Sequence, residues 1–197
     1  MPVSSTNTAT PPGAALPLVL YDGFDSNANG WWIGDDGQSI GCQVAAGKYR
    51  CELRPNTAVP HWHWLGQSLA TEFYLAIDAR HVSGGRDSEA SLIFQRVGNH
   101  HYLFSVRDDQ MFRVLYRNET LIPLIDWTKS AAIRASQANR LAVRAKGSHY
   151  VILINDLQVG EIDDNRLSKG LAGVHVFSST TNEPAIFEFD NYELRQR

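Results

Sequence analysis

The sequence predicts an all-β fold, either an antiparallel sandwich or a barrel. From about residue 19 onward, short runs rich in Val, Ile, Leu, Phe and Tyr are separated by turn residues at roughly 8–12-residue intervals. Several runs alternate apolar and polar side chains with the period of two that a half-buried strand requires. The one segment with good helix propensity, 129–139, lacks a wide apolar stripe, so we expect a loop with at most one helical turn there.

The expected strands follow one another along most of the chain. They span residues 43–54, 70–79, 90–97, 101–107, 111–117, 140–145, 150–154, 158–162, 170–177 and 185–194. Alternation places Leu92 and Phe94 on one face together with Arg96, and it places Arg113 on the face opposite Phe112. Other runs are apolar on both faces, which is typical of strands in stacked sheets.

The composition indicates a soluble globular protein. Of the 197 residues, 43% are hydrophobic and 20% are charged, and the formal net charge is −3. A chain of this length can bury about 70% of its unfolded surface in one domain. The basic residues are scattered, which argues against a nucleic-acid partner. No apolar run is long enough to span a bilayer.

Residues 1–17 differ in composition from the rest of the chain. They are rich in Ser, Thr and Pro and carry no charged side chain, so we expect a flexible stalk followed by a single domain over 18–197. The segment lacks the basic start and the longer apolar run of a signal peptide. A stalk that opens onto a folded domain indicates a piece of a longer protein; the alternative is a mobile N-terminus of a complete one.

Cys42 and Cys51 are the only cysteines, and a hairpin centred on Ala46 and Gly47 would place them directly opposite each other. A cross-strand disulfide there would close a short loop and contribute about 2–3 kcal/mol. We expect this bridge, and with it an oxidising, extracytoplasmic compartment. The alternative is two buried free thiols in a cytoplasmic domain. Two cysteines at this spacing do not predict a zinc site.

An ordered set of short motifs runs along residues 19–197. It includes LYDGFDSNANGW, AGKYRCEL, ATEFYLAIDAR, VILINDLQVGEIDD and FEFDNYEL. By these motifs the chain resembles the concanavalin A-like lectin/glucanase superfamily, and within it bacterial laminin-G-like domains and domains of the 3-keto-disaccharide hydrolase type. The resemblance implies a jelly-roll sandwich of two antiparallel sheets.

The resemblance also raises the question of glycoside hydrolysis. Laminarinase-type glucanases of this superfamily carry a Glu-x-Asp-x-x-Glu strand, whose alternation brings the carboxylates to one face. The nearest string here begins at Glu161 and has Arg166 in place of the acid/base Glu. Asp163 and Asp164 fit better as residues that cap a turn. We therefore assign no catalytic residue and favour a role other than catalysis.

Relatives in this superfamily often carry a structural calcium ion. The matching positions are Asp22 or Asp25, Gly47 and Asp190, which offer the mixed carboxylate and carbonyl oxygens that calcium prefers. The alternation breaks at Asp190 and Asn191, which predicts a β-bulge. The alternative is that Asp190 accepts backbone N–H bonds and holds the two ends of the domain together.

Aromatic rings beside planar polar side chains favour a carbohydrate ligand, because a ring stacks on the sugar while Arg or His bonds to hydroxyl groups. The candidate ligand-binding residues are Trp62, Trp64, Arg96, Tyr102, Arg113 and His175. Each also has a structural interpretation.

The structural alternatives concern the tryptophans and histidines. Trp32, Trp64 and Trp127 would pack in the core, and His175 would be a hydrogen-bonded core histidine. If 61–64 is extended, its two His share one face and its two Trp the other. No third ligand accompanies the two His, so they do not predict a metal site.

Together these observations favour a non-catalytic ligand-binding domain, for carbohydrate or for sensing, in a larger bacterial protein. We expect it to be a tethered monomer that lies outside the cell, on its surface or in the periplasm. One rival is a glycoside hydrolase-like enzyme, which would need two carboxylates converging in the concave groove. The other is a protein-interaction or structural module, with a filled concave face and an apolar patch elsewhere.

Overall fold

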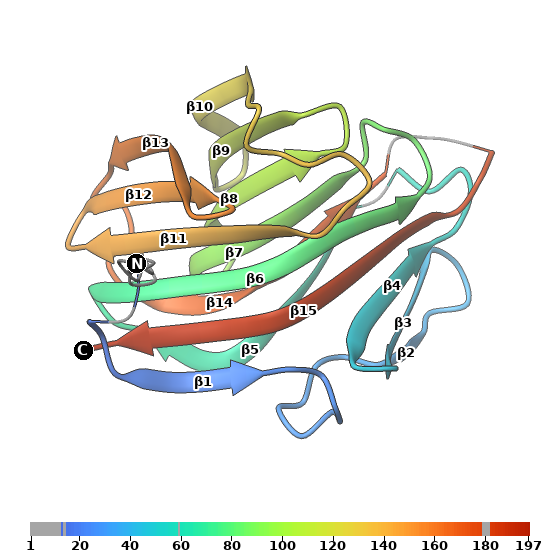
Figure 1. The fold of residues 1–197 in the computed structure, drawn as a ribbon, viewed down its shortest axis with the longest axis horizontal. Coiled ribbons are helices and arrows are strands. Elements are labelled where there is room, and N and C mark those ends of the chain that lie inside the picture. Colours follow the sequence, from blue (N-terminus) through green and yellow to red (C-terminus); the bar gives the residue numbers. More distant parts are fainter. Residues whose placement is uncertain (1–12, 14, 59, 179–181) are drawn as a thin grey trace, which may run out of the picture.

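The computed structural model describes residues 13, 15–58, 60–178 and 182–197, which form two antiparallel β-sheets packed face to face (Figure 1). The larger sheet has the order β13-β12-β11-β6-β15-β4-β3-β2, and β1 also pairs with β15. Its strands are β1 (Leu18–Asp22), β2 (Gly34–Asp35), β3 (Ile40–Ala45), β4 (Lys48–Leu53), β6 (Glu72–Ser83), β11 (Asn139–Lys146), β12 (His149–Ile154), β13 (Leu157–Asp163) and β15 (Ala185–Gln196).

The smaller sheet has the order β10-β9-β8-β7-β14-β5. Its strands are β5 (His61–Leu69), β7 (Glu89–Val97), β8 (His100–Arg107), β9 (Met111–Arg117), β10 (Leu121–Lys129) and β14 (Gly170–Phe177). The predicted all-β jelly-roll sandwich is therefore confirmed. Among the described residues, no helix is long and apolar enough to cross a membrane.

The core lies between the sheets. Because successive side chains of a strand point to opposite faces, every second residue of each central strand points into it. Figure 1 shows β6, β11 and β15 crossing in front of the strands of the smaller sheet. Phe73 of β6 and Tyr150 of β12 meet Phe94 and Tyr102 of the other sheet, with ring centroids 5.0–6.5 Å apart. Because one face of β7 and β8 is used here, their other face points away from the core.

The strands missed by sequence reasoning lie at sheet edges or pair in an irregular way. β5 and β10 are the two edges of the smaller sheet, and β10 contains Pro123 and two register shifts. Edge strands tolerate Pro and polar residues because one side of each needs no ladder hydrogen bonds, and this weakens their sequence signal. Residues 130–138 form turns, as expected, and no helix.

The predicted hairpin has the predicted register, with Cys42 opposite Cys51 in β3 and β4. Ala46 and Gly47 have φ values of 52° and 67°, and two positive φ values in a two-residue loop are the mark of a type I′ turn. The two cysteines are joined by a disulfide. The expected bridge is therefore confirmed.

Two local expectations need correction and one is confirmed. Arg96 does not share a face with Leu92 and Phe94, because Gln95 adopts φ 55° at a β-bulge and reverses the alternation. Residues 1–12 and 14 of the expected stalk lie outside the described residues. Gly13 and residues 15–17 pack on the larger sheet, where Gln196 N–H donates to the carbonyl of Pro17. The bulge expected at Asn191 is present, with φ 50° and a register shift in β15.

A candidate ligand-binding face on the smaller sheet

The side of the smaller sheet that points away from the core carries an unusual mixture of side chains. We call this side the outer face. It displays Glu89, Ser91, Ile93 and Arg96 of β7, His101, Leu103, Ser105 and Arg107 of β8, Arg113, Leu115 and Arg117 of β9, Trp127 of β10, His175 of β14, and Trp62 and Trp64 of β5. Polar, charged and aromatic groups thus cover a small apolar floor.

The floor is a cluster of Ile93, Leu103 and Leu115, against which Trp62 packs. Beside it a groove of about 230 Å³ crosses the strands, with Glu89, Arg113 and His175 among its lining residues. The groove is therefore apolar at its base and has charged groups on its walls, which is the usual composition of a small-molecule site.

His175 projects from β14, next to the edge strand β5, and is 4% exposed. Its Nδ1 is 3.0 Å from the hydroxyl of Ser91, which is 2.8 Å from the hydroxyl of Ser105. Burial lowers the pKa of His175 to about 3, so the ring is neutral at pH 7. The ring of Trp62 stacks on it, with centroids 5.6 Å apart and planes 19° apart. Trp62 is therefore held flat against the sheet.

Glu89 and Arg113 form an ion pair in the groove. One guanidinium nitrogen of Arg113 lies 2.7 and 2.8 Å from the two carboxylate oxygens of Glu89, which is 5% exposed. The ring of Trp127 packs against the guanidinium of Arg113 at 4.4 Å and that of Arg107 at 4.5 Å. The Nε of Arg113 is buried and has no hydrogen-bond partner among the described residues.

Two further arginines rest on the tryptophans of β5. The guanidinium carbon of Arg117 is 4.2 Å from the ring centroid of Trp62, and that of Arg96 is 3.6 Å from the centroid of Trp64. Trp64 is 37% exposed. Aromatic surface and guanidinium groups are therefore adjacent and open to solvent at this end of the outer face.

Five of the six predicted ligand-binding residues lie on the outer face. The exception is Tyr102, which points into the core, is 0% exposed and donates its hydroxyl to Asp164 at 2.7 Å. Buried between the sheets, Tyr102 cannot contact a ligand on the outer face, and we remove it from the candidate set. Glu89, His101 and Arg117 were missed, although alternation along their strands could have placed all three opposite the core residues.

The tryptophans expected in the core are not there. Trp31, 2% exposed, takes the core position, and its Nε1 donates to Asp22 at 2.8 Å. Trp32 is 40% exposed, and Trp127 is half-buried on the outer face. Adjacent residues of an extended chain point in opposite directions, so only one of Trp31 and Trp32 can pack inward.

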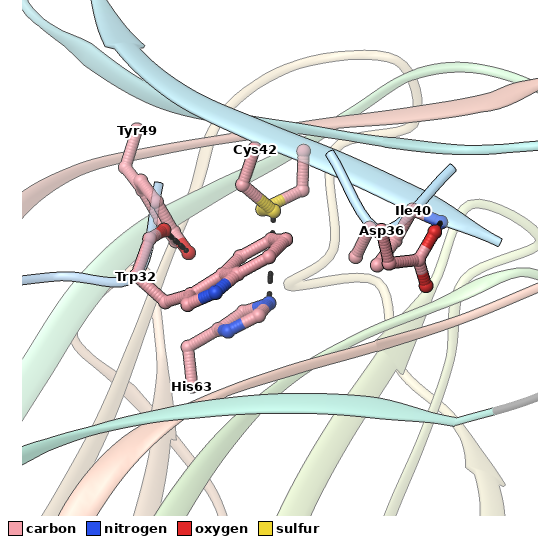
Figure 2. Close-up of a disulfide and its surroundings, with 7 residues drawn as sticks. Trp32, Asp36, Ile40, Cys42, Tyr49 and His63 are labelled. Carbon is pink, nitrogen blue, oxygen red and sulfur yellow. Dashed lines mark hydrogen bonds between the residues drawn. A yellow bond between two sulfur atoms is a disulfide. The ribbon is translucent and has the colours of Figure 1, made fainter. Parts of the chain in front are cut away.

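Figure 2 shows that His63 of β5 contacts the disulfide of the larger sheet. The Nε2 of His63 lies 3.6 Å from the Sγ of Cys42, and the ring of Trp32 stacks on His63 with planes 3° apart. Burial lowers the pKa of His63 to about 4. His63 and His61 face inward while Trp62 and Trp64 face outward, as alternation predicts. The sulfur atoms near His63 are bonded to each other, so they are not metal ligands in this state.

The structure separates Asp22 from Asp190, two of the expected calcium ligands. Asp22 faces the core, where its two oxygens accept hydrogen bonds from the Phe24 amide and the Trp31 indole. Asp190 faces outward from the same sheet and pairs with Lys48. Asp25 is exposed, and Gly47 lies near the carbonyl of Gly23. Opposite faces of a sheet cannot serve one ion, so Asp22 and Asp190 do not fit together in the calcium site that the resemblance implies.

The string that begins at Glu161 lies at the end of β13, away from the groove. Asp163 is exposed and pairs with His149. One Asp164 oxygen accepts from the hydroxyl of Tyr102 and the amide of Arg166, at 2.7 and 2.9 Å. Asp164 thus caps a turn, as its sequence context indicates.

No protein-family model and no curated protein matches the sequence. Solved structures do match. The carbohydrate-binding module CBM66 from Bacillus subtilis has a TM-score of 0.63 and 16% identity, over 89% of this chain and 95% of that one. A Bacillus subtilis protein of unknown function with a galectin-like fold has a TM-score of 0.68 and 11% identity, over 91% and 96%.

The galectin LEC-6 from Caenorhabditis elegans also matches, with a TM-score of 0.51 and 13% identity over 74% of this chain and 96% of that one. At these identities the likeness concerns the fold alone. The chain therefore has the galectin-like, concanavalin A-type jelly-roll fold.

Proposed function

We propose that this domain binds a carbohydrate on the outer face of its smaller sheet. The observation that carries the proposal is the pairing of Trp62 and Trp64 with Arg117, Arg96 and His175 beside a groove. Aromatic rings offer the apolar surface that sugar rings stack on, and the adjacent guanidinium groups offer donors for hydroxyl groups. The fold shared with a carbohydrate-binding module and a galectin supports the same function.

Binding is favoured over hydrolysis by the state of the carboxylates in the groove. Glu89 and Glu119 line it. Glu89 is held in the ion pair with Arg113, which already engages both of its carboxylate oxygens. Retaining and inverting glycosidases both need two carboxyl groups that act on opposite sides of the scissile bond.

The proposal includes a place for the domain. We infer that it works outside the cytoplasm, as the ligand-binding or sensory part of a larger protein. The Cys42–Cys51 disulfide supports this, because disulfides persist in oxidising compartments. The test is thiol labelling of cell fractions. We expect the full-length protein to be secreted with its two cysteines oxidised and therefore unlabelled.

The experiment that tests binding is a thermal-shift and calorimetric screen against soluble oligosaccharides. A sugar with a Kd of 0.1–1 mM, supplied at 10 mM, stabilises the folded state by about 1.4–2.7 kcal/mol. Trp62→Ala should weaken binding at least tenfold, because truncation removes the stacked ring. The matched control is Tyr21→Ala, which removes an aromatic side chain, 53% exposed, from the larger sheet. A shift that Tyr21→Ala abolishes and Trp62→Ala leaves intact would exclude the outer face.

A further inference from the structure

Two arginines of the outer face have no acidic partner. Arg107 pairs with Asp109, and Arg113 pairs with Glu89. Neither Arg96 nor Arg117 has a carboxylate oxygen within 4 Å among the described residues, and the residues outside that set include no Asp or Glu.

These two charges are also partly withdrawn from water. Both side chains are half-buried, and burial lowers the pKa of each guanidinium from its usual value. Burial of a charge without a partner is costly, and proteins usually offset it with an opposite charge. Arg96 and Arg117 therefore present two cationic groups whose counter-charge is not supplied by the chain.

His101 lies between the two arginines. It is the cross-strand partner of Arg117, and after burial the charges of Arg117 and Arg96 are the largest causes that lower the pKa of His101, to about 4. The ring is 3% exposed, and neither of its nitrogen atoms has a hydrogen-bond partner among the described residues. A neutral histidine carries no charge, so His101 does not balance the two guanidinium groups beside it.

The tryptophans fix how the guanidinium groups are presented. Trp62 and Trp64 are alternate residues of β5 and lie about 7 Å apart along the strand. A guanidinium that rests on an indole contacts it with its flat face, so its N–H edges stay free for an acceptor in the plane. Such an edge matches the two oxygens of a carboxylate or a sulfate.

We propose that the ligand of this face is an anionic glycan, whose carboxylate or sulfate group is bound by Arg96 and Arg117 beside Trp62 and Trp64. The inference rests on the proposed carbohydrate function and specifies its ligand class. Glu119 lines the groove near Arg117 but forms no ion pair with it, so it does not neutralise the cluster.

The test uses two matched pairs of saccharides, measured by calorimetry. Oligogalacturonides are compared with their methyl esters, and sulfated galactan oligosaccharides with their desulfated forms. We expect at least one anionic member to bind ten times more tightly than its neutral counterpart, because a hydrogen bond to a charged group is worth about a factor of ten or more. The pair that shows this difference identifies carboxylate or sulfate as the group bound. Affinity should also fall as salt is raised.

Variants locate the effect. Arg96→Gln and Arg117→Gln should each weaken the anionic saccharide about tenfold. Arg80→Gln removes the same charge from the larger sheet, where Arg80 is 47% exposed, and should leave affinity unchanged. Circular dichroism and melting curves establish that each variant is folded.

The outcomes separate the two proposals. If neutral saccharides bind as tightly as anionic ones and Trp62→Ala abolishes both, the carbohydrate function stands and the anionic class is wrong. If Arg80→Gln weakens anionic binding as much as Arg117→Gln, the attraction is a general effect of charge and the site is refuted. If none of the four saccharides and no neutral sugar of the wider screen binds, both proposals fall.

Discussion

Reduction of the Cys42–Cys51 bridge should lower the stability of the domain by an amount that the structure allows us to calculate. The bridge joins residues nine apart in sequence. For a closed loop of about ten residues, the chain-entropy model gives about 2.6 kcal/mol at 25 °C. In a protein of 150–250 residues each kcal/mol shifts the melting temperature by roughly 2–4 °C, so we expect a fall of about 5–10 °C.

The assay is a calorimetric melt of the oxidised protein with and without a dithiol reductant. Reduction in place is cleaner than substitution, because the two sulfur atoms are buried and their removal would add a cavity. The Cys42→Ala/Cys51→Ala variant is the control, since the reductant should not change its melting temperature. An oxidised protein that melts at the same temperature as the reduced one would refute the reasoning. The type I′ turn would then hold the hairpin equally well without the bridge.

The remaining predictions concern pH, a buried hydroxyl and calcium. The pKa of His175 is lowered from 6.5 to about 3, so its contribution to stability is complete above pH 6.5 and is lost as the pH falls toward 3. Of the fall in the free energy of urea unfolding between pH 7 and pH 5, His175 should account for about 2 kcal/mol, and His175→Gln should remove that part of the pH dependence. Tyr102→Phe should lower the free energy of unfolding by about 1–3 kcal/mol in the same assay, because it leaves the largely buried carboxylate of Asp164 without one donor. An unchanged free energy of unfolding would contradict this. EDTA should leave the melting temperature unchanged, because Asp22 and Asp190 face opposite sides of the larger sheet; a drop of several degrees that calcium reverses would restore the calcium site.

Sequence reasoning located the strands that have neighbours on both sides, but of the edge strands it found β13 and missed β5 and β10. The hairpin of Cys42 and Cys51 was predictable to the residue, since a two-residue turn fixes every pair of its register. β5 and β10 were not, because edge strands may be polar or contain Pro. The same limit applies to the site, since Trp62 and Trp64 lie on an edge strand.

The alternation of side chains along a strand predicts which face each residue lies on only where no bulge interrupts the strand. It placed Arg113 correctly, on the face opposite Phe112. It failed for Arg96, because a single left-handed residue, Gln95, shifts the phase of β7 by one. No local pattern marks that bulge. The bulge lies against β14, where a Cβ on Gly170 would come within 2.4 Å of the Gln95 backbone, so this contact requires glycine at position 170.

The outer face carries polar and charged groups that the stability of the fold does not require. A sheet face with only a structural role could be covered with small polar residues, which need no hydrogen-bond partners from neighbouring side chains. Here His101 has two buried nitrogen atoms, and Arg113 a third, without hydrogen-bond partners among the described residues. Each such group costs about 1–3 kcal/mol, and local violations of this kind are expected where function requires them. The unpartnered groups lie on the same face as the guanidinium groups over Trp62 and Trp64. An anionic ligand held by those guanidinium groups would offset the cost of burying their charge, which is the reason to look for it at this place in the fold.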